Sequence, residues 1–213
     1  MENTTAVTHD ISAYQEKGEL IDENIWEATI AHEIFHHWFG NIVTAESWSN
    51  LALNEAFANY GEYLWFEHAY GKDYADAHLL KGRERYLNKD EDYKTKDLVR
   101  FQYSDRDDMF DAVSYEKGGM VLHMLRDYVG DAQFFAALKK YLTDFKFGTA
   151  EVHDLRLVFE EVSGKDLNWF FNQWFLGSGH PELLVMSEVG GFNNQVTVNI
   201  SQAGSVYEFP LTI

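Results

Sequence analysis

The motif H-E-x-x-H at residues 32–36 constrains the fold more than any other feature, because it ties a local structure to a specific chemistry. In an α-helix, His32 and His36 lie one turn apart on the same face, where both imidazoles can reach a single metal ion. Apolar residues recur at helical spacing around the motif, and Gly40 supplies a common helix stop. The sequence therefore predicts a helix over residues 25–39 that carries two metal ligands.

A candidate for the third ligand follows further along the chain. A catalytic zinc ion requires three protein ligands and one open position, and two histidines with a distant carboxylate are a known solution. Glu55 lies near the start of a second helical pattern, over residues 50–70, so its carboxylate can point back at the first helix. H-E-x-x-H alone also occurs by accident in chains that bind no metal. The addition of Glu55 at a suitable spacing favours a zinc site that holds one Zn2+ per chain.

The composition limits the partners of the chain. It has 213 residues, 46% of them hydrophobic, which is enough to bury a core of the globular type. A formal net charge of −18 argues against nucleic acid or an anionic membrane as a partner, because both would repel it. The sequence contains no cysteine, no apolar run of about 20 residues and no signal peptide. We expect a soluble protein without a membrane span, and the compartment stays open between cytoplasm and periplasm or secretion.

Helical patterning dominates the middle of the chain, and the predicted fold class is mainly α (α+β). Several of the predicted helices end at a glycine. After the first two, the predicted helices cover residues 73–88, 115–129, 131–145, 149–162 and 166–176. The charged and weakly patterned stretch 89–108 is predicted to be a loop, either one that borders the site or a solvated connector.

Strand-like segments stand at both ends. Residues 1–8 are rich in Thr and Val and predict a strand, and the alternating residues after Pro181 flank a Gly-Gly-Phe-Asn-Asn turn, which predicts a β-hairpin. We therefore assign a catalytic domain to residues 1–181 and the start of a β domain to residues 182–213. Because strand patterns run up to both termini, the chain reads as a piece of a longer protein.

Three separated blocks of residues carry a family resemblance. They are Met1-Glu2-Asn3, the segment H-E-I-F-H-H-W-F-G-N at 32–41 with Leu53-Asn54-Glu55, and Tyr115-Glu116-Lys117-Gly118. In this order, the blocks resemble the catalytic domain of the gluzincin aminopeptidases of metallopeptidase family M1, the group of aminopeptidase N and leukotriene hydrolase. The resemblance covers most of residues 1–182 and implies a thermolysin-like fold of packed helices with a residual N-terminal strand.

The resemblance and the chemistry of peptide hydrolysis imply roles for the central residues. Zinc would be held by His32, His36 and Glu55. Glu33 would be the general base that takes the proton of a zinc-activated water and later passes it to the leaving amine. Tyr115 would donate a hydrogen bond to the oxyanion that forms on the carbonyl.

The resemblance also implies roles for two outer carboxylates. Glu2 would bind the free ammonium group of a peptide substrate, which makes the expected enzyme an aminopeptidase. Glu62 lies on the same helical face as Glu55, where the family similarly places a carboxylate behind a zinc histidine, although an exposed helix glutamate is the alternative. Asp111 is expected to shape the pocket ahead of Tyr115 without a chemical role. Surface or packing positions are expected for the other histidines, which are His9, His37, His68, His78, His123, His153 and His180.

The chain also departs from the family pattern. Ala52 and Ala56 stand where many relatives carry Trp and Gly, and His37 stands where Gln is frequent. None of the three is an expected ligand, so we expect effects on packing or pocket shape. Relatives have an additional amino-terminal β domain and a large carboxy-terminal region, so the catalytic residues can be present in a fragment that is inactive on its own.

The predicted function is the hydrolysis of the N-terminal peptide bond of peptides that have a free N-terminus. A non-catalytic zinc-binding or scaffold domain of the same fold is the alternative. Intact Glu33 and Tyr115 argue against it, because a domain that only binds needs neither a base nor an oxyanion donor. An epoxide hydrolase activity at the same zinc is a lesser alternative that nothing in the sequence requires. The preferred N-terminal residue and the oligomeric state are not decided by the sequence.

Overall fold

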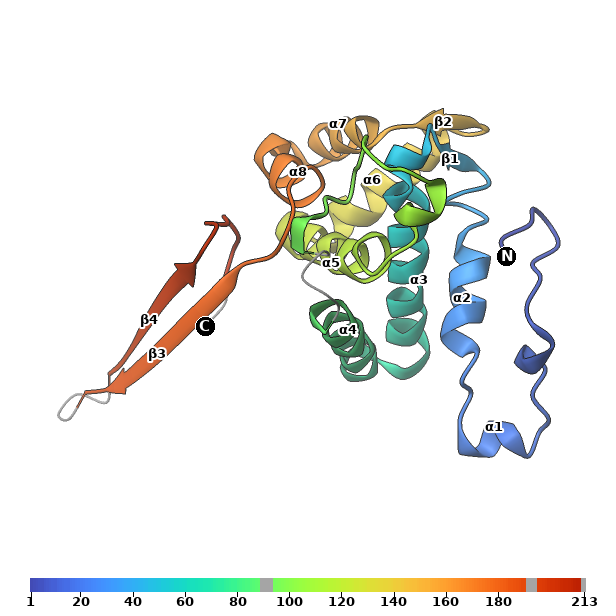
Figure 1. Ribbon diagram of the computed structural model, residues 1–213, viewed down its shortest axis with the longest axis horizontal. Helices are drawn as coiled ribbons and strands as arrows, with labels where there is room; N and C mark the ends of the chain where they lie inside the picture. The colour runs from blue at the N-terminus through green and yellow to red at the C-terminus, as the bar shows by residue number, and fades with distance from the viewer. Residues whose placement is uncertain (89–93, 191–194, 212–213) are drawn as a thin grey trace.

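The computed structural model describes residues 1–88, 94–190 and 195–211, which form a helical body with a projecting β-hairpin (Figure 1). The helices are α1 (Glu19–Asp22), α2 (Glu27–Phe35), α3 (Ala52–Tyr70), α4 (Lys72–Leu87), α5 (Gly118–Val129), α6 (Asp131–Asp144), α7 (Val152–Ser163) and α8 (Asn168–Trp174). The strands are β1 (Val43–Ala45), β2 (Gly148–Ala150), β3 (Glu182–Val189) and β4 (Val196–Ala203). The mainly α prediction is confirmed, and no helix in the described ranges is long and apolar enough to cross a bilayer.

Helix α3 is the centre of the body. It packs against α2, α4 and α5, and most of its residues are buried. Phe57 is 1% exposed, and its ring stacks at 4.2 Å on that of Phe39, which follows α2. A helix with neighbours on several sides must be apolar around most of its circumference, as this one is. The position of α3 therefore fixes the surroundings of every side chain that it carries.

Two glycines let the neighbours of α3 approach closely. A Cβ atom at Gly61, on α3, would lie 2.4 Å from Cγ of Phe35 on α2. A Cβ atom at Gly118, the first residue of α5, would lie 2.5 Å from Cβ of Ala56 on α3. Both separations are far below van der Waals contact, so a larger side chain at either position would push a helix away from α3.

The chain turns sharply after α2 and enters a short parallel sheet. The predicted helix over residues 25–39 stops at Phe35, because the N–H group of Asn41 bonds the carbonyl of His36 at 3.0 Å and reverses the chain. Strand β1 then pairs in parallel with β2, with Val43 opposite Gly148. This pairing was not predicted, and it delays the start of α7 to Val152 because the preceding residues form β2.

The predicted strand over residues 1–8 does not form. The N–H group of Thr8 instead bonds the carbonyl of Met1 at 3.1 Å, and that of Ala6 bonds the carbonyl of Asn3 at 3.0 Å. Thr5 adopts a positive φ of 64°, which closes the turn. Because these backbone groups are satisfied within the segment and no strand in the described part of the chain pairs with it, the Thr and Val content does not produce a strand.

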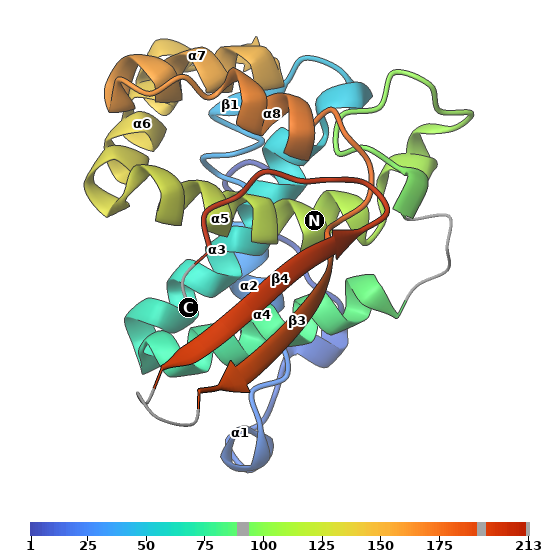
Figure 2. The ribbon, with the colours of Figure 1, turned by 90° about the vertical axis from the view of Figure 1, so that its left-hand side faces the viewer.

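The predicted hairpin after Pro181 is confirmed. Strands β3 and β4 are antiparallel, with Glu182 opposite Ala203 and Val189 opposite Val196. The two strands cross in front of α4 and α5 in the view of Figure 2 and stand apart from the body in Figure 1. The division into domains at residues 181 and 182 stays a prediction. Part of the predicted loop 89–108, residues 89–93, lies outside the described residues.

Candidate active site

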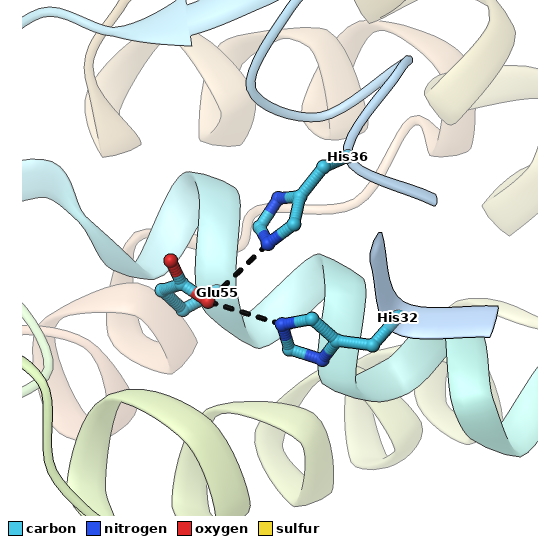
Figure 3. Close-up of side chains that lie close together, drawn as sticks. All are labelled: His32, His36 and Glu55. Atoms are coloured by element: carbon cyan, nitrogen blue, oxygen red, sulfur yellow. Dashed lines mark hydrogen bonds and ion pairs between the residues drawn. The ribbon is translucent and has the colours of Figure 1, made fainter. Parts of the chain in front are cut away.

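Three buried side chains converge where the end of α2 meets the start of α3. His32 lies in α2, His36 caps its C-terminus, and Glu55 lies in the first turn of α3. Nε2 of His32 is 3.2 Å and Nε2 of His36 is 3.4 Å from Oε2 of Glu55. Figure 3 shows both imidazoles pointing at this carboxylate. We call these three residues the metal cluster, since a ligand atom from each lies within 4.8 Å of the other two.

The donor set of the metal cluster fits a zinc ion. Nδ1 of His32 donates to Oε1 of Glu62 at 2.9 Å, and Nδ1 of His36 donates to the carbonyl of Phe39 at 2.9 Å. With Nδ1 protonated, the neutral form of each ring presents the lone pair of Nε2, so two nitrogens and a carboxylate oxygen can act together as metal ligands. Ligand atoms of a tetrahedral zinc ion are about 3.3 Å apart. The separations of 3.2 Å and 3.4 Å agree with that value.

Charge in the metal cluster favours a cation. Burial lowers the pKa of His32, but the hydrogen bonds and charges of Glu55 and Glu62 outweigh burial and raise that pKa to about 9. Burial likewise raises the pKa of Glu55, and its contacts with His32 and His36 outweigh burial and lower it to about 2. Both shifts show that the site stabilises positive charge between these groups. A divalent cation at this point would replace the protons.

Glu62 lies behind His32, at the place that the resemblance predicts. It is 8% exposed, and its second oxygen accepts a hydrogen bond of 2.9 Å from Nε2 of His78 on α4. Burial raises the pKa of Glu62, but hydrogen bonds from His32 and His78 lower it. A carboxylate held from both sides keeps the ring of His32 in one orientation and one tautomer.

The contact of His78 with Glu62, which in turn holds His32, was not predicted from the sequence. His78 was assigned to a surface or packing position, because no ligand partner stands at a suitable spacing around it. Its partner Glu62 belongs to a different helix, and no periodicity in the sequence connects α3 with α4. Among the described residues, the other histidines outside the motif stay away from the metal cluster.

Tyr115 lies across the site in a π-helical turn, η5 (Val113–Lys117), which we call the tyrosine turn. Its ring stacks on that of His32, with centroids 5.7 Å apart and planes 14° from parallel. Burial raises the pKa of Tyr115 strongly, and the carboxylates of Glu55, Glu2 and Glu33 raise it further. The phenol therefore stays protonated at neutral pH and can donate a hydrogen bond.

Glu33 and Glu2 complete the surroundings of the site. The Glu33 carboxylate is 15% exposed and lies 2.9 Å from the amino group of Met1. The carbonyl of Glu2 accepts a hydrogen bond of 2.7 Å from Asn41, which holds the first residues beside the end of α2. The structure thus brings all seven predicted site residues to one region, and it places Glu2 there through a turn and not through the strand that was expected.

Comparisons with known proteins found matches over most of the chain. Residues 1–174 match the peptidase family M1 domain. The chain is 30% identical over 223 residues to the tricorn protease-interacting factor F2 of Thermoplasma acidophilum, an alignment that covers 100% of this chain and 28% of that protein. The chain thus spans under a third of the length of that relative.

Two solved structures share the fold. The crystal structure of Legionella pneumophila aminopeptidase A in complex with aspartic acid matches with a TM-score of 0.69 and 28% identity, over 90% of this chain and 21% of that one. The M1 zinc metallopeptidase from Deinococcus radiodurans matches with a TM-score of 0.63 and 29% identity, over 73% of this chain and 34% of that one.

Proposed function

Because the chain belongs to peptidase family M1, we propose that it is the catalytic part of a zinc aminopeptidase, which removes N-terminal residues from peptides. The observation that carries the proposal is the convergence of His32 Nε2, His36 Nε2 and Glu55 Oε2, with Tyr115 stacked beside them. The names of two relatives support the same function: the Deinococcus protein is called a zinc metallopeptidase, and the Legionella protein is called an aminopeptidase.

The metal cluster would hold one zinc ion, which when bound acidifies water and polarises a carbonyl group. Glu33 follows His32 directly in the chain, and its carboxylate is close enough to Tyr115 to raise the pKa of the phenol. It would take a proton from the attacking water and pass it to the nitrogen of the leaving amine, as a general base that then becomes a general acid. With this proton, the nitrogen can leave as a neutral amine when the tetrahedral intermediate re-forms its carbonyl group and the C–N bond breaks.

Tyr115 would stabilise the oxyanion of the tetrahedral intermediate. Its raised pKa keeps the phenolic proton in place, so the hydroxyl donates at neutral pH and does not compete as a base. The charge that develops on the substrate carbonyl would then meet a donor beside His32, on which the ring of Tyr115 stacks.

Glu2 would select substrates with a free N-terminus. Its carboxylate is close enough to Tyr115 to raise the pKa of the phenol, which places a negative charge within the site. An ammonium group gains a charge-assisted contact with such a carboxylate, and an acylated nitrogen does not. The substrate would thereby be positioned with its first peptide bond over Tyr115.

A non-catalytic zinc-binding or scaffold domain is the alternative. A domain that only binds zinc would need neither the carboxylate of Glu33 nor a half-buried phenol stacked on His32, and this chain has both side chains. We therefore retain the enzyme as the proposed function.

A panel of aminoacyl chromogenic substrates, each free and N-acetylated, tests the proposal on the complete protein. We expect cleavage of the free forms, with kcat/KM at least about 100-fold higher than for the acetylated forms, since the amine contact is lost on acylation. Equal cleavage of both forms would remove the amine-binding role from Glu2. No cleavage of any member by zinc-loaded protein would favour the scaffold alternative.

A further inference from the structure

The tyrosine turn, which carries Tyr115, has π-helical and not α-helical hydrogen bonding. The N–H group of Lys117 bonds the carbonyl of Ala112 at 3.0 Å, across one residue more than in an α-helix. Single π-helical turns are rare and depend on outside contacts to stay in that form. The direction of the Tyr115 ring therefore depends on whatever fixes this turn.

Asp111 receives the first three N–H groups of the tyrosine turn. Its Oδ1 atom accepts hydrogen bonds from the backbone of Val113 at 3.0 Å and Ser114 at 3.1 Å. Its carbonyl oxygen accepts the N–H group of Tyr115 itself at 3.1 Å. One residue thus sets the start of the turn, including the backbone of the tyrosine.

Asp111 is in turn held by Arg100. NH1 of Arg100 lies 2.9 Å from Oδ2 of Asp111, and the two side chains are only 9% and 7% exposed. NH2 of the same guanidinium donates to Oγ of Ser114 at 3.2 Å, so the arginine contacts the tyrosine turn directly as well. A buried, forked arginine contact is geometrically rigid and worth more than a surface ion pair.

Arg100 also connects the tyrosine turn to the helix that carries Glu55. Its backbone N–H group bonds the carbonyl of Ser49 at 3.3 Å, in the short turn η2 (Trp48–Asn50) that leads into α3. The contacts therefore run from the start of α3 through Arg100 and Asp111 to Tyr115. They define the position of the phenol relative to Glu55, which lies in the first turn of α3.

We propose that Asp111, held by Arg100, is a positioning residue that sets the Tyr115 hydroxyl for catalysis. The inference rests on the proposed function, since it requires that Tyr115 stabilises the oxyanion. Removing the charge of Asp111 leaves the buried guanidinium without this carboxylate, so that only uncharged acceptors such as Ser114 Oγ are left near the turn, and the turn is expected to loosen. A shift of about 1 Å in a catalytic group can cost about 100-fold in rate.

A double-mutant cycle between Asp111→Asn and Tyr115→Phe in the complete protein tests the proposal. In the otherwise native enzyme, Asp111→Asn is expected to lower kcat about 10- to 100-fold, with KM changed less than about threefold and zinc content unchanged. In the Tyr115→Phe background, the same change should lower kcat by less than about twofold, because the hydroxyl that Asp111 positions is absent.

Each outcome decides between the two proposals. Equal losses in both backgrounds, or an unchanged kcat for Asp111→Asn alone, overturn the positioning role and leave the proposed function intact. An unchanged kcat for Tyr115→Phe alone overturns the oxyanion role of Tyr115 and with it the positioning role of Asp111, but not the proposed aminopeptidase activity. If Asp111→Asn does not fold, Arg100→Lys keeps the charge, loses the forked contact and should show the same dependence on the Tyr115 hydroxyl.

Glu67→Gln is the matched control. Glu67 also pairs with a buried arginine, since Oε2 lies 2.8 Å from NH1 of Arg126, but it is near the other end of α3. Twelve residues of helix separate it from Glu55, about 18 Å. We expect a loss of thermal stability without the loss of kcat. A similar drop in kcat for Glu67→Gln would show that Asp111 acts only through overall stability.

Discussion

The metal cluster and the tyrosine turn face each other across the site, but the molecule holds them in different ways. The metal cluster comes from α2 and α3, two regular helices that pack through the contact of Gly61 with Phe35. Its ligands are oriented by neutral acceptors and by Glu62, all within or beside those helices.

The tyrosine turn depends on long-range polar contacts. It follows the irregular segment that contains η4 (Arg106–Met109), and its start is fixed by the buried pair of Asp111 with Arg100. Packing supports it as well, since Val113 is fully buried in the core and Gly118, at the other end, meets Ala56. The comparison indicates that metal binding and oxyanion stabilisation can be lost separately, and the following substitutions test that separation in order of their expected effect on turnover.

The largest effect is expected from Glu55→Ala, which removes a ligand of the metal cluster. Two histidines alone should hold less than about a tenth of an equivalent of zinc per chain after dialysis. Activity should fall to background, and metal analysis of the purified protein checks both results against the native enzyme at about one zinc per chain. Full zinc content in this variant would show that the ligand assignment is wrong.

Glu33→Gln should abolish proton transfer at the metal cluster without affecting zinc binding. The amide cannot take a proton, so kcat is expected to fall about 100- to 10,000-fold. Zinc content should stay near that of the native protein, because Glu33 is not a ligand. Stopped assays and metal analysis on the same preparation make the measurement, and near-native turnover would exclude Glu33 as the base.

Tyr115→Phe removes the hydroxyl of the tyrosine turn and keeps its ring. We expect kcat to fall about 100- to 1,000-fold, as for the loss of one oxyanion donor, with zinc retained. The stacking on His32 at 5.7 Å should persist, since it involves only the ring. Loss of zinc in this variant would contradict the separation of the two halves.

His78→Ala should weaken metal binding with little direct effect on chemistry. It frees one oxygen of Glu62, which can then relax away from His32. Loss of such an outer partner typically costs about 10-fold in metal affinity. Competition with a chelator measures the change in metal affinity. His68→Ala serves as the control, because His68 is exposed near the end of α3, the helix that carries Glu62. Equal affinities for the two variants would assign His78 to packing alone.

The smallest effect on turnover, less than about threefold, is expected for Lys117→Met, which conserves volume at the end of the tyrosine turn. Lys117 is 3% exposed and donates to the carbonyl of Gly177 at 3.1 Å. Burial lowers its pKa to about 8, from 10.5. The unfolded chain therefore binds more protons than the folded one between these values, and the native protein gains stability as pH rises from 8 to 10.5.

Denaturant unfolding at both ends of this pH window tests the shift of the Lys117 pKa. The Lys117→Met variant lacks the titrating group. Its free energy of unfolding, relative to that of the native protein, should therefore be highest at the lower pH and fall by up to about 3 kcal/mol at the higher pH. A constant difference between the two proteins would show that the lysine has an ordinary pKa.

Much of the fold and the metal cluster could be predicted because the relevant signals are local. Helical periodicity located α2 to α8 within a few residues, and the spacing of His32 and His36 put both rings on one face. Glu62 follows from the same periodicity, two helical turns beyond Glu55. Turn composition likewise located the hairpin of β3 and β4.

Other features depend on contacts between distant segments. The strand predicted over residues 1–8 is absent because no partner strand pairs with it, and β1 pairs with β2 although more than 100 residues separate them. His78 meets Glu62 only because α4 lies against α3. The positioning role that we propose for Asp111 depends on its contact with Arg100, which the spacing of the two residues in the sequence did not indicate.

By itself, the sequence determined that His32 and His36 share one face of a helix and that Glu33 stands next to them, because helix geometry repeats every few residues and needs no further information. The tertiary structure decided where Tyr115, Glu2 and His78 lie relative to those ligands. Their distances from the metal cluster are set by packed helices, a buried ion pair and turns that close over long stretches of chain. Such contacts leave no fixed spacing in the sequence.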